Sequence, residues 1–324
     1  MPSPSSSLAT LRPDLAASLE EFDLQANRGG FIALQALPVI DVAEAAGVFG
    51  RIPIEQLLQC PDTARSPGSG YSRGNWKFET DSYATKEQGH EEPVDDNEAR
   101  MYANYFDAEQ VSAERAREAV LMSQEQRVAA ALFNATTFSS QKTTIVNEWD
   151  DFDNATPIDD IETGIAAVYS RCGLWCNTLI INRKVFRNLR RCAQILERIA
   201  SNGAGSAVKA RDVTVQMLSE VFDIDKILVA GGSKNTAKEG QAAAVDQVWS
   251  SEYAMVCVTE DRQDVRRPCI GRTFHWAEDS SQIGGLIETY RDETIRGDVV
   301  RARHQVGEKM MLAEAAQLFD NVTT

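Results

Sequence analysis

The chain has 324 residues, of which 43% are hydrophobic and 25% are charged. This is too much chain for one small core, and the composition matches ordinary globular proteins, which excludes wholesale disorder. With 33 Lys and Arg against 48 Asp and Glu, the formal charge is −15. Such a surface repels nucleic-acid phosphates, so sequence-specific DNA binding is disfavoured.

The sequence contains no segment that predicts a membrane or secretory location. Its longest apolar stretch, 31–40, contains Gln35 and Pro38 and is far shorter than the roughly twenty residues needed to cross a bilayer. The first residues lack the basic region and apolar core of a secretory signal. The six cysteines are scattered, without the density of a disulfide scaffold. We therefore expect synthesis in the cytoplasm, reduced thiols and no membrane partner.

Two elements are expected before residue 43. Leu15, Leu19 and Phe22 recur at three- and four-residue steps, which predicts an amphipathic helix over 11–26. Residues 31–42 then predict an extended apolar segment, and Pro38 favours a sheet edge for it.

The segment 59–97 cannot build a core of its own. It contains no Leu, Ile or Met and is punctuated by Gly and Pro. Trp76 and Phe78 alternate with polar neighbours, as in a strand, and Ile52, Ile54 and Leu57 precede them as a possible partner strand. Together they predict a long polar hairpin. Because an isolated hairpin is marginal in water, we expect this one to find its support on another molecule.

A single long helix is predicted from residue 98 onward. The apolar positions keep helical spacing for more than thirty residues, which corresponds to about 50 Å of helix. An acidic run at its start is interpreted as complementing the helix dipole, with contact to a basic patch as the alternative. The run consists of Glu91, Glu92, Asp95, Asp96 and Glu98.

The remainder predicts a mixed α and β region followed by a final strand system after residue 285. A helix over 157–172 is favoured by Pro157 in its first turn and Gly173 past its end. A buried strand running into a basic helix is expected over 177–189, a Gly/Ser loop over 201–206 and a further helix over 214–222. Strands are expected within 142–149, 226–232, 248–258 and 272–278.

No metal or cofactor site is predicted. Asp150, Asp151 and Asp153 lie close together, but the obligatory glycine and one oxygen ligand of a calcium loop are missing, so we interpret them as a solvated acidic connector. Cys172 and Cys176 are four residues apart without a second pair or matching histidines, which favours structural thiols over zinc.

Ser233 is the nearest approach to a catalytic nucleophile. The stretch 231–235 would resemble a hydrolase elbow if glycine stood in place of Asn235. The frame of a phosphate-binding loop is also absent. A glycine turn after the preceding strand is the favoured interpretation.

A basic cluster follows the predicted strand at 177–182. It is either a nucleic-acid patch or a surface that meets acidic segments of a neighbouring copy, and the acidic balance of the chain favours the second. Its members are Arg183, Lys184, Arg187, Arg190, Arg191 and Arg198.

The order of these parts resembles a tailed-bacteriophage major capsid protein of the Hong Kong 97 type. The resemblance covers nearly the whole chain, and its most specific portions are Asn-Thr-Ala-Lys-Glu-Gly at 235–240 and Asn-Thr-Leu at 177–179. Further similar segments lie at 65–73, 125–135, 157–165, 222–241 and 248–256.

The resemblance implies an α+β capsid fold in five parts. These are an N-terminal arm and edge segment (1–46), an extended hairpin called the E-loop (47–92), a peripheral domain with the long helix (93–165), an axial domain (166–285) and a return to the peripheral domain (286–324). It implies a structural protein without enzymatic activity. Many copies, as hexamers and pentamers, would form the icosahedral head shell around double-stranded DNA.

The resemblance also implies partners and contact residues. The E-loop would lie across an adjacent subunit through Arg65, Tyr71, Arg73, Trp76, Lys77 and Phe78. A separate scaffolding protein is expected because the chain lacks a long N-terminal scaffolding region, and a portal is expected too. A cement protein is left open. DNA would be contacted non-specifically, in a virion assembled in the host bacterial cytoplasm.

Two alternatives remain, and one family property is not carried over. An encapsulin-like nanocompartment shell shares the fold, and a soluble hydrolase using Ser233 is the other reading. Some relatives join a lysine to an asparagine of a neighbour. Lys77, Lys86 and Asn321 are the only candidates here, and their match is not specific, so we do not predict the bond.

Overall fold

The structure is a computed structural model. It describes residues 10–11, 30–277, 283 and 286–323, apart from positions 52, 54, 55, 57, 76, 78, 103–106, 202–211, 239, 243 and 264–266. No helix among these residues is both long enough and apolar enough to span a membrane.

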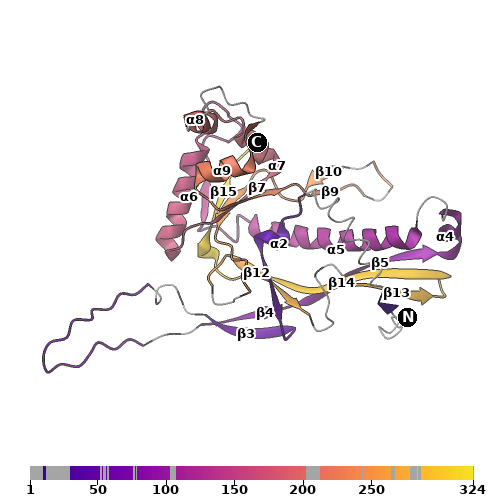
Figure 1. Ribbon diagram of the computed structural model, residues 1–324, viewed down its shortest axis with the longest axis horizontal. Helices are drawn as coiled ribbons and strands as arrows, with labels where there is room; N and C mark the ends of the chain where they lie inside the picture. The colour runs from indigo at the N-terminus through magenta and orange to yellow at the C-terminus, as the bar shows by residue number, and fades with distance from the viewer. Residues whose placement is uncertain are drawn as a thin grey trace.

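A long sheet forms one side of the molecule (Figure 1). Its order is β1–β13–β14–β12–β2, with β5 also paired to β14. The strands are β1 (Thr10–Leu11), β2 (Val39–Val42), β5 (Lys86–Asp95), β12 (Gly271–Trp276), β13 (Leu286–Asp292) and β14 (Gly297–Met310). Helix α5 (Ala108–Leu132) runs along this sheet, and the short α4 (Asp96–Tyr102) precedes it.

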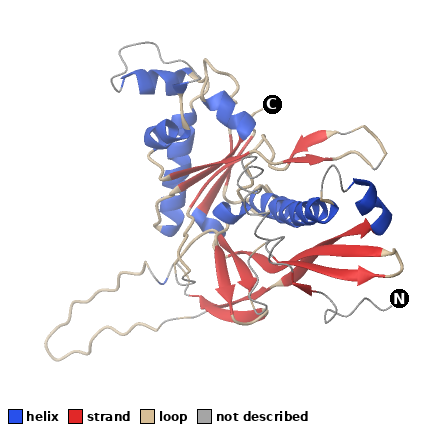
Figure 2. Ribbon diagram, turned by 45° about the vertical axis from the view of Figure 1, so that its right-hand side comes forward, coloured by secondary structure: helices blue, strands red, loops and turns tan. Residues whose placement is uncertain are grey.

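A second sheet carries the larger core. Its order is β6–β15–β11–β7–β8. The strands are β6 (Lys142–Thr144), β15 (Ala316–Asp320), β11 (Ala254–Cys257), β7 (Thr178–Asn182) and β8 (Lys226–Ala230). Helices gather around it in Figure 2, and they are α6 (Pro157–Cys172), α7 (Arg183–Leu189), α8 (Ala193–Ser201) and α9 (Val215–Phe222).

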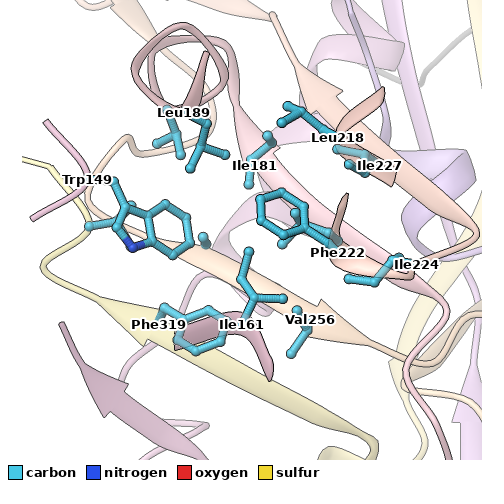
Figure 3. Close-up of a cluster of buried hydrophobic side chains, with 14 of the residues drawn as sticks. Trp149, Ile161, Ile181, Leu189, Leu218, Phe222, Ile224, Ile227, Val256 and Phe319 are labelled. Atoms are coloured by element: carbon cyan, nitrogen blue, oxygen red, sulfur yellow. The ribbon is translucent and has the colours of Figure 1, made fainter. Parts of the chain in front are cut away.

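Strand β7 shows why this sheet is buried on both faces. Leu179 and Ile181 belong to the cluster under α6, α8 and α9 (Figure 3). Ile180 belongs to a separate cluster with α2 (Ala33–Ala36) and the end of α5. Because side chains alternate between faces along a strand, a strand whose five residues are all buried needs a covering layer on each side.

Two hairpins stand outside these sheets. Strands β3 (Ala46–Arg51) and β4 (Glu79–Ala84) pair antiparallel, and so do β9 (Ser233–Asn235) and β10 (Val245–Gln247). A short 3-10 turn, η4 (Ala313–Ala315), joins β14 to β15.

Local signals placed several elements correctly. Pro157 lies in the first turn of α6, and Gly173 caps its end at φ 68°, where glycine is favoured. The β7–α7 and α9 predictions are likewise confirmed. Strand β2 is an edge strand, as Pro38 indicated.

Other expectations need correction. The single helix from residue 98 is instead α4 and α5, and Asp107 caps α5 by accepting hydrogen bonds from the backbone nitrogens of Glu109 and Gln110. At 25 residues, α5 is about 37 Å long. The segment 31–42 is not extended throughout, since it forms α2 before β2.

Some expected elements fall outside the described residues. The helix over 11–26 does so except for Leu11, which is in β1. The Gly/Ser loop over 201–206 does so except for Ser201, the last residue of α8.

Strand pairing also bears on the final segment. Residues 286–324 were expected to return to the peripheral side as a whole. Strand β14 lies in the long sheet, but β15 pairs with β11 and β6 in the second sheet. The chain end therefore ties the two sheets together.

Candidate assembly surface

The β3–β4 hairpin is anchored at its base on the long sheet. The Tyr83 ring stacks on Phe274 of β12 at 4.5 Å between centroids and 10° between planes, and Phe49 lies 6.2 Å from the same ring. Arg51 donates to the Met311 carbonyl at 3.0 Å. The expectation that the hairpin lacks support within its own molecule is therefore wrong for its base.

The paired strands also differ from the predicted ones. Strand β3 ends at Arg51 and β4 begins at Glu79. The expected partner residues Ile52, Ile54 and Leu57 lie outside the described residues. The apolar contacts at the base of the hairpin thus come from Phe49 and Tyr83. These residues lie closer to the body than the strand residues that the sequence pattern predicted.

Beyond the strands, the loop tip has no support from the rest of the described chain. We define the loop tip as residues 58–75 and Lys77; it contains no helix or strand, and every one of these residues is exposed. Figure 1 shows the loop extending far from both sheets. Leu58, at its start, lies beside Gly173 at the end of α6.

The contacts of the loop tip are local. The Arg65 guanidinium lies 4.7 Å from the centre of the Tyr71 ring and its Nε donates to the Ser69 carbonyl at 2.7 Å. Tyr71 is nevertheless 73% exposed. A cation–π pair at such a site contributes only about 0.5–1 kcal/mol, so these contacts shape the tip without burying it.

The structure brings the described contact candidates together on this tip. Arg65, Tyr71, Arg73 and Lys77 are all exposed there, and the Lys77 backbone nitrogen donates to the side chain of Gln56 at 2.6 Å. Trp76 and Phe78 lie outside the described residues.

The acidic run at the start of α4 pairs within its own chain. Asp95 accepts the backbone N–H of Asn97 at 2.7 Å, which confirms a capping role. Asp96 receives two hydrogen bonds from Arg291, each 2.6 Å, and Glu92 lies 3.5 Å from Arg115. Contact of this acidic run with the basic cluster of a neighbouring copy stays a prediction.

A second ion group crosses the long sheet. Arg301 Nε and Arg303 Nη2 each donate to the Glu288 carboxylate at 3.0 Å. Burial raises the pKa of Glu288, but the hydrogen bonds from Arg303 and Arg301 outweigh it, so the pKa is lowered overall. The arginines of β14 therefore stabilise the sheet from which the hairpin base projects.

Sequence reasoning missed Glu125, which joins α5 to the start of α2 and to Trp249. It is buried in α5 and accepts hydrogen bonds from the backbone nitrogens of Ile32 at 2.9 Å and Ala33 at 2.8 Å. It also accepts from Trp249 Nε1 at 2.6 Å. Burial raises the pKa of this carboxyl, and although the three hydrogen bonds act to lower it, the pKa is raised overall. The sequence signal that could have revealed Glu125 as a buried residue was its position on a largely apolar helix face.

Ser233 and the three histidines lie on different strands. Ser233 lies exposed in β9, whereas His90, His275 and His304 lie in β5, β12 and β14. Within the described part of the chain, no three potential ligands are arranged to hold a metal. Cys172 and Cys176 are buried, and burial raises the pKa of the Cys176 thiol to about 12.

Comparisons with known proteins agree with this architecture. No protein-family model matches the chain. The major capsid protein of Burkholderia phage BcepMu is 25% identical over 299 residues, which span 90% of this chain and 91% of that protein.

Solved structures share the fold at lower identity. A phage-related protein from Bordetella bronchiseptica RB50 has a TM-score of 0.70 at 18% identity, covering 97% of this chain and 98% of its own. The capsid structure of Cyanophage P-SCSP1u gives 0.55 at 11%, covering 87% and 85%. An encapsulin complex from Synechococcus elongatus PCC 7942 gives 0.50 at 11%, covering 90% and 87%.

The two sheets, the helix α5 and the projecting hairpin thus define a shell-forming protein with the Hong Kong 97-type fold. Within that class, the similarity to a phage major capsid protein along nine tenths of the chain makes this protein a phage capsid protein, as the resemblance predicted. The encapsulin similarity is one of fold alone.

Proposed function

We propose that copies of this chain assemble as hexamers and pentamers into the icosahedral head shell of a tailed phage, around double-stranded DNA. The observation that carries the proposal is the loop tip, because all of its described residues are exposed while its base is fixed on the long sheet. A loop of this length without secondary structure of its own is usually either functional or disordered, and a function in subunit contact accounts for this one.

The loop tip supplies the contact with the next copy. Tyr71 anchors it, together with Trp76 and Phe78, since buried aromatic side chains dominate interface energies. Arg65, Arg73 and Lys77 pair with the acidic surface of the neighbour, which the charge of −15 makes available.

The parts of the fold take the roles named for them. The E-loop is residues 47–92, which contain most of the β3–β4 hairpin, its tip and most of β5; the peripheral domain is 93–165 with α5, to which 286–324 return; and the axial domain is 166–285, with β7, β8, β11 and α7 to α9. Residues 1–46 supply the arm and edge segment.

Other virion components complete the assembly. A separate scaffolding protein directs the copies, a portal occupies one vertex, and a cement protein is an open addition. Packaged DNA is contacted non-specifically, because the acidic balance of the chain opposes tight binding to phosphate. Assembly takes place in the cytoplasm of the bacterial host.

The test is purification of the protein alone and with its scaffolding partner, followed by light scattering, negative-stain microscopy and nuclease digestion. We expect megadalton shells that, in infected cells, protect DNA. Shells that protect an enzyme cargo and no DNA would identify a nanocompartment. A small discrete species whose hydrolase activity is lost in Ser233→Ala would contradict the proposal.

A further inference from the structure

Two sequence features that were considered separately meet at one cavity of about 570 Å³. Its lining comes from α7, from the ends of β7 and β8, and from the β9–β10 hairpin. The basic cluster and the glycine turn with Ser233 therefore face the same space. Arg190 and Arg198 of that cluster do not line it.

The fold places this cavity where ligands commonly bind. Strands β7 and β8 are parallel, and the lining residues Asn182 and Ala230 are the last residues of these strands. In α/β sheets the crevice outside the carboxyl ends of parallel strands is the usual ligand site.

The floor of the cavity is fixed by hydrogen bonds. The Asn182 amide donates to Gln247 Oε1 at 2.7 Å, and its oxygen accepts from the Lys184 backbone nitrogen at 2.7 Å. The backbone N–H of Val248 donates to the Gly232 carbonyl at 3.0 Å. These bonds hold the hairpin and α7 on opposite sides of a preformed space.

Most of the charged residues that line the cavity are basic, and one, Asp246, is acidic. Arg183, Lys184, Arg187 and Arg191 contribute to its lining. No ion pair joins Arg183 or Arg187 to an acidic residue of the described chain. Asn188 also contributes to the lining.

We propose that this cavity binds carboxylate side chains of a second copy of the chain, so that it is a contact between subunits in the shell. The inference deepens the proposed assembly and rests on it. Arginine guanidinium groups supply the paired donors that carboxylates fit.

Charge and shape favour this occupant over packaged DNA. Every copy carries an excess of acidic residues, 48 against 33 basic ones, so carboxylates are abundant at any contact between copies. A DNA backbone is bound by basic residues along an open groove. Here the arginines converge on a cavity that also contains the carboxylate of Asp246.

The test uses assembled shells made from a mixture of unlabelled and nitrogen-15-labelled chains. A carbodiimide joins carboxylates to the Lys184 amine where the two are in contact, and mass spectrometry shows whether the joined peptides come from different copies. We expect mixed-isotope products at Lys184. Arg187→Glu lowers them by roughly tenfold, and Arg198→Glu, the same charge change outside the cavity, leaves them unchanged.

The outcomes separate this inference from the proposed function. If the wild-type chain forms no shells, the proposed function fails. If shells form but Lys184 joins only carboxylates of its own chain, the cavity inference is overturned. It is also overturned if Arg187→Glu reduces only the DNA content of shells, since phosphate would then be the occupant.

Discussion

At the scale of single residues, buried charges decide how the sheets are held. Glu288 is 8% exposed and receives hydrogen bonds from both Arg301 and Arg303. Removing one partner of such a group costs more than the pair itself contributes, because the remaining charges stay buried.

Glu288→Gln should lower the free energy of unfolding by about 1–3 kcal/mol, measured by urea denaturation at neutral pH. The pKa of Glu288 is lowered in the folded chain, so the stabilisation it supplies is present above its unfolded pKa, about 4.3, and is lost as pH falls through the lower folded value. The Glu288→Gln variant should therefore lack the part of the acid-dependent loss of stability that comes from protonation of Glu288. Glu293→Gln, at an 82% exposed side chain, is the control, and equal effects of both variants would refute the assignment.

At the scale of elements, predictions succeeded where the signal was local. Helix α6 matches its prediction at both ends because Pro157 and Gly173 act on their own turns. The end of α4 and the start of α5 also had a local signal, since Asp107 is followed by Gln110 three residues later, the spacing of a capping box. The spacing of apolar residues, used alone, predicted one continuous helix where the structure has two.

Predictions failed where the partner is distant in sequence. Strand β5 pairs with β14, with Asp95 opposite Gly297. Nothing in the sequence of either strand identifies the other as its partner. The same holds for Tyr83 on Phe274 and for Glu125 at the start of α2. The exposed tip was predictable because an absence of apolar residues is a property of the segment itself.

Tyr83→Ala tests the role of the hairpin base. The ring stacks on Phe274, and such pairs contribute about 0.5–1.5 kcal/mol, so the subunit should remain folded while the hairpin loses its fixed direction. We expect a lower yield of shells by light scattering, with Tyr83→Phe assembling normally. Full yield from Tyr83→Ala, with an unchanged assembly rate, would show that base packing does not direct the loop.

At the scale of the whole molecule, support is divided between the chain and its neighbours. Within the described chain, β14 and β15 connect the two sheets, and Glu125 fixes α5 to Trp249. The loop tip is the part that the body leaves exposed. Ordering a residue costs about 1–2 kcal/mol of backbone entropy, and in the proposed shell contacts with another copy would meet that cost for the tip.

Amide hydrogen exchange over residues 58–75, compared between dispersed subunits and assembled shells, tests this division most directly. The account predicts rapid exchange throughout the tip in the subunit and strong slowing in the shell, while the strands of the second sheet stay protected in both. Equal exchange of the tip in the two states would contradict it, whether the amides were protected already in the subunit or remained open in the shell.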